Sequence, residues 1–269
     1  MAIADTAATW ASDSWFVPLR ADAESAVRMF AFPHAGAGPG SMASLAAACA
    51  PHVDLWAANL PGRQARQREP ARTDLEPLVD DLADAVATHA GERFTLFGYC
   101  SGALLAYLVA RRLDTAGVVA ARLFVGSMAA PDVAEIPRRL HLLPSELFWQ
   151  QLPAQGGASA ELAARRDMRP VFEPALRADF ALVAGYRHRS QPPMSIPITV
   201  LYGDADTLLS RGGLLGWRRQ TSVGVDLREI GGSHWLLDEA VDHVARAIVT
   251  ASLRDPLQPP AADEQHASE

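Results

Sequence analysis

A short glycine-flanked segment, Gly98-Tyr99-Cys100-Ser101-Gly102, constrains the fold of this chain more than any other feature. It lies between an apolar run typical of a buried strand, Phe94–Phe97, and an apolar run at helical spacing, Ala103–Leu113. A Gly-x-nucleophile-x-Gly sequence at a strand-to-helix turn is typical of a nucleophile elbow. In such a turn the central residue takes strained backbone angles, and the glycines keep other side chains away.

Cys100 occupies the central position of this turn, at the amino end of the expected helix. The partial positive charge of a helix amino end favours the thiolate, which is the reactive form of cysteine. Ser101 comes one position later, so its hydroxyl is expected to point elsewhere. Outside such a turn a free cysteine is usually a buried apolar residue, and Cys49 is interpreted in that way. We predict that Cys100 is the nucleophile.

The chain has 269 residues and only two cysteines, which indicates a reducing compartment rather than a disulfide framework. Met1–Ser14 does not have the basic and apolar regions of a signal peptide. No apolar run approaches the ~18 residues that a membrane span needs. These features predict a soluble cytoplasmic protein without a membrane partner.

Short apolar runs typical of strands alternate with runs at helical spacing along the chain. This alternation predicts an α/β fold with a mainly parallel sheet and helices on both faces; together with the elbow it predicts an α/β-hydrolase fold. We expect one domain over residues 15–253. The expected strands are Val27–Phe32, Val53–Leu60, Phe94–Phe97, Leu123–Val125, Ile198–Tyr202 and Val225–Ile230, and the expected helices of the body are Met42–Ala50, Leu75–His89, Ala103–Leu113 and Leu236–Leu253.

One long segment, about residues 131–193, interrupts this alternation. It contains no strong strand pattern but has helical patterns at Ser145–Leu152, Ala158–Met168 and Pro174–Tyr186. Ligands bind at the carboxyl ends of the strands in open α/β sheets, so we expect a helical lid insertion over that edge. The terminal segments, 1–14 and 254–269, are rich in small, polar or proline residues and are expected to be disordered.

A cysteine nucleophile needs a base, and the base needs an orienting acid. Of the eight histidines, His234 follows the last expected strand on a glycine loop, where the base of this fold belongs. The acid is expected in the loop after Ile198–Tyr202, which contains two aspartates. We favour Asp206, deeper in the loop, over Asp204, which is expected to cap the turn through its own backbone.

Acyl transfer also needs two donors for the developing oxyanion. The backbone N–H of Ser101 is the first candidate, because it directly follows the nucleophile. The backbone N–H of Ala35, in the loop after the strand Val27–Phe32, is the second.

The composition excludes several other functions. The formal net charge is −7, which argues against a general nucleic-acid binder. The glycine-rich segment Gly36–Gly40 does not have the spacing of a dinucleotide fingerprint, and the chain has no lysine for a P-loop. No cofactor and no metal are expected.

Several segments, in this order and spacing, resemble the type II thioesterases that accompany polyketide and nonribosomal peptide synthetases. The resemblance covers nearly the whole expected domain. Its segments are Phe30–Gly36, Leu60–Arg63 with Arg66, Phe97–Ala103, Leu140–Pro144, Leu176–Phe180 with Tyr186, Pro197–Val200, Gly203-x-x-Asp206 and Gly231–Leu236.

The resemblance implies a lidded α/β-hydrolase that takes acyl groups from the phosphopantetheine thiol of an acyl or peptidyl carrier protein, in antibiotic-type biosynthesis. Such an enzyme would act through a Cys100–His234–Asp206 triad, and a monomer is expected. Family members usually carry serine at the position of Cys100, and Ser233 is an additional polar residue before His234.

Cysteine at this position leaves three functions open. A cysteine acyl-enzyme is itself a thioester, so its formation is nearly thermoneutral, and a second carrier thiol or an amine can accept the group. Hydrolysis of the thioester is favoured, because it is the family's usual activity. The first alternative is an acyl or aminoacyl transferase that shuttles the group between carriers, as some cysteine-bearing relatives do. The second alternative is a noncatalytic binding module.

Two groups of arginines are candidates for docking an acidic carrier protein. They are Arg63, Arg66, Arg68 and Arg72 after the second expected strand, and Arg165, Arg166 and Arg169 in the lid. Ordinary solvated surface charge is the alternative interpretation.

Overall fold

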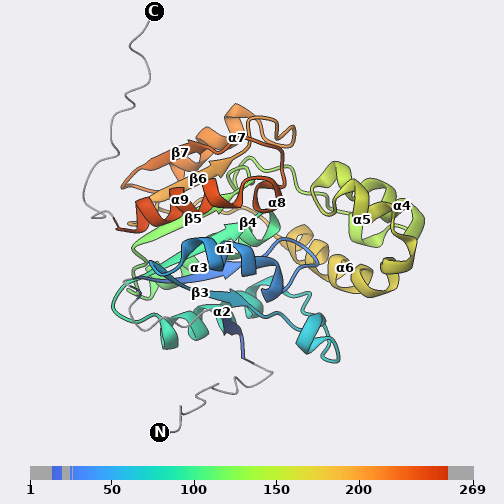
Figure 1. Cartoon of the computed structure of the whole chain (residues 1–269), viewed down its shortest axis with the longest axis horizontal. Coiled ribbons are helices and arrows are strands. Elements are labelled where there is room, and N and C mark those ends of the chain that lie inside the picture. Colours follow the sequence, from blue (N-terminus) through green and yellow to red (C-terminus); the bar gives the residue numbers. More distant parts are fainter. Residues whose placement is uncertain (1–13, 20–24, 26, 254–269) are drawn as a thin grey trace, which may run out of the picture.

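In the computed structural model, which describes residues 14–19, 25 and 27–253, the strands form one seven-stranded sheet in the order β1-β3-β2-β4-β5-β6-β7 (Figure 1). The strands are β1 Phe16–Pro18, β2 Val27–Phe32, β3 Val53–Ala58, β4 Phe94–Tyr99, β5 Arg122–Gly126, β6 Ile198–Tyr202 and β7 Val225–Glu229. All neighbouring pairs are parallel except β1 and β3. The carboxyl ends of six strands therefore meet at one edge, and the α/β-hydrolase fold is confirmed.

The expected strands lie where the apolar runs predicted them, with ends that differ by up to two residues. The edge strand β1 was not predicted, because three residues are too few to show an alternating pattern. Phe16 nevertheless packs edge-on against Phe30 and Phe32, with ring centroids 4.9 and 5.6 Å away, so this short strand belongs to the core.

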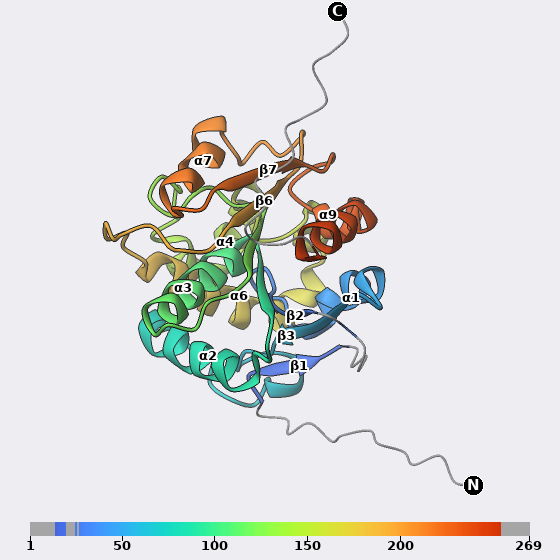
Figure 2. The same ribbon diagram turned by 90° about the vertical axis from the view of Figure 1, so that its left-hand side faces the viewer.

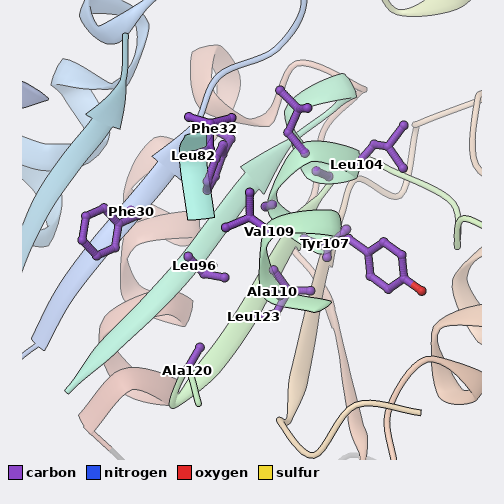
Figure 3. Close-up of a cluster of buried hydrophobic side chains, with 14 of the residues drawn as sticks. Phe30, Phe32, Leu82, Leu96, Leu104, Tyr107, Val109, Ala110, Ala120 and Leu123 are labelled. Atoms are coloured by element: carbon purple, nitrogen blue, oxygen red, sulfur yellow. The ribbon is translucent and has the colours of Figure 1, made fainter. Parts of the chain in front are cut away.

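Helices cover both faces of the sheet (Figure 2). On one face lie α2 Leu75–His89 and α3 Ser101–Thr115, which pack against Phe30, Phe32, Leu96 and Leu123 (Figure 3). On the other face lie α1 Ala43–Cys49 and α9 Val241–Leu253. Strand β2 shows the alternation, because Phe30 belongs to the first cluster, whereas Met29 and Ala31 belong to the second.

The expected final helix, Leu236–Leu253, is wrong as one element. It consists of α8 Leu236–Glu239 and α9, separated by Ala240, whose φ of −144° is not helical. A further short helix, α7 Arg211–Leu215, lies between β6 and β7 and was not predicted. It contains two glycines, which weaken its helical pattern.

The segment between β5 and β6 forms a helical layer at one end of the sheet (Figure 1). Its helices are α4 Ser145–Gln151, α5 Ala160–Ala164 and α6 Arg169–Gly185. The expected start of the last helix at Pro174 is wrong, because α6 begins five residues earlier and contains this proline. The lid has a small core of its own, which includes Phe148, Trp149 and, from the loop after β2, Ala35.

The expected disorder of 1–14 and 254–269 lies outside the described residues, apart from Ser14. No helix among residues 14–19, 25 and 27–253 has both the length and the apolar character of a membrane span.

Candidate active site

Cys100 lies at the turn between β4 and α3 and has φ 53° and ψ −125°, a strained conformation for a residue other than glycine. The glycines on both sides allow this turn to pack tightly. A Cβ on Gly98 would lie 2.3 Å from the Cα of Ala103, and a Cβ on Gly102 would lie 2.2 Å from the carbonyl oxygen of Phe32. The turn thus has the geometry of a nucleophile elbow, with the Cys100 thiol partly exposed.

His234 and Asp206 form a buried pair on the loops after β7 and β6. The Nδ1 atom of His234 lies 3.0 Å from Oδ2 of Asp206, and the other carboxylate oxygen accepts the N–H of Leu208 at 2.9 Å. The Asp206 side chain has no exposed surface, so both of its oxygens are fixed by protein groups. This arrangement orients the Nε2 atom of His234 away from the acid.

The two loops that carry this pair are packed directly on each other. A Cβ on Gly203 would lie 2.1 Å from the carbonyl oxygen of Gly232. The expectation that Asp204 caps its own turn is wrong, because its Oδ1 accepts the N–H of Gly232 at 2.8 Å. Asp204 therefore joins the two loops, and Asp206 is the aspartate that reaches His234.

The backbone of His234 is held by two residues that the sequence did not single out. The hydroxyls of Tyr99 and Ser127 donate to its carbonyl oxygen at 2.6 and 3.1 Å. Tyr99 directly precedes Cys100, so its position in the elbow could have indicated a role in supporting the site. Ser127 follows β5 and has φ 49°, and no sequence pattern marks it.

Ser233, the additional polar residue before His234, is part of the same loop scaffold. Its N–H and its hydroxyl donate to the two carboxylate oxygens of Glu239, each at 2.6 Å. Its hydroxyl oxygen also accepts the N–H of Trp235 at 3.2 Å. Ser233 thus fixes the loop to α8, a role that its position in the sequence did not indicate.

Gly156 of the lid lies against both Cys100 and His234. Its carbonyl oxygen accepts the Cys100 thiol at a sulfur–oxygen distance of 3.6 Å. A Cβ added to Gly156 would lie 2.5 Å from Nε2 of His234. The nucleophile and the imidazole therefore converge beneath one lid residue, although they come from distant parts of the sequence.

The electrostatics of His234 depend on both of its neighbours. Burial of the ring opposes a positive charge, but the negative charge of a Cys100 thiolate and the hydrogen bond to Asp206 outweigh it, and the pKa of His234 is raised to about 10. The His234 ring can therefore be an imidazolium at neutral pH.

His34 lies close to this pair but has the opposite character. Burial and the charge on His234 lower the pKa of His34 to about 4, although Asp179 opposes this effect. Its ring packs edge-on against Tyr99 and Trp235. His34 is thus neutral at pH 7 and serves as packing rather than as a second cation.

The two expected oxyanion donors lie on adjoining segments. Ser101 is the first residue of α3, so its N–H has no partner within the helix. The Ala35 N–H makes no backbone hydrogen bond within the described part of the chain. The close contact of Gly102 with the carbonyl oxygens of Phe32 and Pro33 brings the loop after β2 against the start of α3.

The structure corrects the carrier-docking interpretation for two arginines. Arg63 and Arg66 are each only 6% exposed, and both donate hydrogen bonds within the protein. Four others lie in ion pairs, namely Arg72, Arg165, Arg166 and Arg169, and of these Arg169 is half-buried. Cys49 is fully buried, which raises the pKa of its thiol to about 12 and agrees with a core role.

No group of three or more histidine, cysteine, aspartate or glutamate side chains within residues 14–19, 25 and 27–253 could hold a metal ion. The fold and the elbow with its converging histidine define a lidded α/β-hydrolase.

The particular family follows from comparison with known proteins. The thioesterase domain family matches residues 27–251, so the chain belongs to this family. It is a thioester hydrolase of the type II thioesterase group, as the sequence resemblance predicted.

The chain matches one relative over a small part of that protein's length and another over nearly all of it. The chain is 34% identical over 238 residues to the AMB antimetabolite synthetase AmbE of Pseudomonas aeruginosa, matching 88% of this chain but 11% of AmbE. It is 28% identical over 229 residues to the gramicidin S biosynthesis protein GrsT of Aneurinibacillus migulanus, matching 85% of this chain and 90% of GrsT.

Among solved structures, the type II thioesterase BorB from the borrelidin biosynthetic cluster superimposes with a TM-score of 0.82 at 29% identity, covering 90% of this chain and 99% of BorB. RedJ, the thioesterase of the prodiginine pathway of Streptomyces coelicolor, superimposes with a TM-score of 0.78 at 28% identity, covering 85% of this chain and 87% of RedJ.

Proposed function

We propose that the chain hydrolyses acyl groups carried as thioesters on the phosphopantetheine arm of a carrier protein, by a Cys100–His234–Asp206 triad and a covalent acyl-enzyme. The observation that carries this proposal is the convergence of Cys100 and His234 beneath Gly156, with Asp206 bonded to the far side of the imidazole. This is the arrangement of nucleophile, base and orienting acid that acyl transfer uses.

In the first step, the Cys100 thiolate attacks the thioester carbonyl carbon and forms a carbon–sulfur bond. The carbonyl oxygen becomes an oxyanion that the N–H groups of Ala35 and Ser101 stabilise. The bond to the pantetheine sulfur then breaks, and that sulfur takes the proton from Nε2 of His234. The raised pKa of His234 supports this proton transfer, because the ring is already an imidazolium before the thiolate attacks.

In the second step, neutral His234 removes a proton from a water molecule as the water attacks the acyl-cysteine carbonyl. The oxyanion forms at the same two amides, and its collapse releases the carboxylic acid and the Cys100 thiolate. His234 is again an imidazolium, so the site returns to its starting state. Asp206 keeps Nε2 directed at the reacting groups in both steps.

The carrier-bound substrate is supported by the relatives. GrsT is described as a gramicidin S biosynthesis protein, and the relative in Streptomyces venezuelae, 29% identical over 230 residues, as the thioesterase PikA5. BorB and RedJ belong to the borrelidin and prodiginine pathways. We infer that this chain works in a polyketide or nonribosomal peptide pathway and meets its substrate on a carrier protein.

The test of hydrolysis uses an acyl-loaded carrier protein together with a second, empty carrier. We expect free carboxylic acid to accumulate at the rate at which the first carrier loses its acyl group. Accumulation of the loaded second carrier in its place would contradict hydrolysis and indicate a transferase. Cys100→Ala is the control for uncatalysed loss of the acyl group from the first carrier, to water or to the second carrier.

A further inference from the structure

A buried ion pair lies beside the catalytic groups without belonging to the triad. Arg63, in the loop after β3, and Asp179, on the lid helix α6, are 6% and 7% exposed. Arg63 Nη2 lies 2.6 Å from Asp179 Oδ1, and a second short bond joins Nη1 to Oδ2. The loss of hydration makes such a pair a poor source of net stability, so its other contacts are informative.

Both members of this pair also hold the backbone of the loop after β2. Asp179 Oδ2 accepts the N–H of Gly36 at 2.7 Å, and Arg63 Nη1 donates to the carbonyl oxygen of Ala37 at 3.2 Å. These groups belong to the two residues that follow Ala35, whose own N–H is the proposed second oxyanion donor.

The same residues form a tight turn. The N–H of Ala37 donates to the carbonyl oxygen of His34 at 3.1 Å, and Gly36 has φ 74°. A positive φ at the third position is characteristic of a type II turn, which differs from type I by a flip of its middle peptide. That middle peptide joins Ala35 to Gly36, and its N–H is the group that Asp179 holds.

The peptide that carries the Ala35 N–H also carries the His34 carbonyl, so the turn hydrogen bond from Ala37 sets its direction. Asp179 selects the orientation of the middle peptide, and Arg63 fixes the residue that closes the turn. Gly36 also packs on α6, where a Cβ would lie 2.7 Å from Leu176 Cδ2.

We propose that Asp179, oriented by Arg63, is a positioning residue that holds the His34–Ala37 turn in its oxyanion-binding form, so that the hole is complete only when α6 of the lid is docked. This proposal rests on the proposed acyl transfer at Cys100. It also accounts for why the segments Leu60–Arg63, Phe30–Gly36 and Leu176–Phe180, distant in sequence, meet at one point.

The test compares two double variants that both lack the buried charges. Arg63→Met with Asp179→Asn retains an oxygen that can accept the Gly36 N–H. Arg63→Met with Asp179→Leu has a side chain with the same branching at Cγ and retains no acceptor. Replacement of both members of a buried ion pair by uncharged groups is often tolerated, and thermal unfolding of the two proteins gives the stability control.

Two reactions of Cys100 are then measured in each variant. Thiol release from acetyl- and hexanoyl-pantetheine passes through an oxyanion, whereas alkylation of the thiol by iodoacetamide does not. We expect the leucine variant to have a kcat for thiol release about 10- to 100-fold below that of the asparagine variant, with similar KM. The alkylation rates of the two variants should be the same.

Equal kcat in the two variants, or a parallel loss of alkylation, would overturn the proposal, since either result indicates only a structural role. If the leucine variant does not fold, Arg63→Met with Asp179→Ala replaces it, because alanine also has no acceptor. No thiol release by the unsubstituted chain would overturn the proposed function itself, and this inference with it.

Discussion

The hydroxyl of Tyr99 donates a 2.6 Å hydrogen bond to the carbonyl oxygen of His234, so the residue that precedes the nucleophile holds the backbone of the base. Tyr99 is 1% exposed, and its ring stacks on the His234 ring with centroids 6.4 Å apart. The backbone of the base is thereby tied to the residue next to the nucleophile.

We expect Tyr99→Phe to lower kcat about 10-fold or more, because small displacements of a catalytic group are costly. The free energy of unfolding should fall by ~1 kcal/mol for the lost hydrogen bond. Tyr107→Phe is the matched control, because Tyr107 is also buried and donates to Gln220 at 2.7 Å, away from the site. A similar kcat for the two variants, measured by thiol release, would contradict a positioning role for Tyr99.

The two aspartates after β6 should differ strongly in their effect on activity. Asp206→Asn is expected to lower kcat by about 10²- to 10⁴-fold, because His234 then loses the acceptor that sets its tautomer. Asp204→Asn keeps an oxygen that can accept the Gly232 N–H, so its kcat should change only a few-fold. Steady-state kinetics with an acyl-pantetheine substrate decide this, and a larger loss in Asp204→Asn would refute the assignment of the acid.

Gly156→Ala tests the contact between the lid and the two reactive side chains. Gly156 has φ 65°, and a Cβ there would press on Nε2 of His234 at 2.5 Å. Gly117→Ala is the control, because Gly117 has φ 78° with open space around a Cβ. Both variants should lose ~1 kcal/mol of stability through the left-handed backbone, but only Gly156→Ala should lose activity and slow the alkylation of Cys100 by iodoacetamide. Equal activity of the two would show that the lid contact is unimportant.

The pKa of His234 provides a test that does not depend on turnover. The charge of the Cys100 thiolate is the largest effect that raises it to about 10. In Cys100→Ala only Asp206 opposes the effect of burial, so the pKa of His234 should fall. Because the imidazolium is present below the pKa, the His234 ring should be protonated at pH 8 in the unsubstituted chain. In the variant, the ring should lose its proton at a lower pH than it does in the unsubstituted chain. NMR titration of the His234 ring resonances measures this directly, and an unchanged pKa would contradict the coupling.

The body of the fold could be predicted from the sequence because most of its strands are largely apolar runs, buried on both faces of the sheet. For the same reason Val27–Phe32 and Ile198–Tyr202 were predicted with their observed ends. Cys100, Asp206 and His234 could be placed because strand ends in this fold meet at one edge, and the structure brings all three together.

What the sequence did not indicate depends on contacts between distant segments. Arg63 and Asp179 each look like surface charges in their local context, and only the docking of α6 on the loop after β3 buries them. Gly156 is one of two consecutive glycines in a lid loop, and no local pattern places it over Cys100. The support that Tyr99, Ser127 and Ser233 give to the His234 loop likewise requires the folded chain.

Intact-protein mass spectrometry after incubation with an acyl-loaded carrier protein shows directly whether Cys100 is the nucleophile. We predict a covalent acyl adduct that disappears in Cys100→Ala and persists in Ser101→Ala, since the latter keeps the backbone N–H of the oxyanion hole. An adduct that persists in Cys100→Ala but disappears in Ser101→Ala would contradict the assignment of the nucleophile.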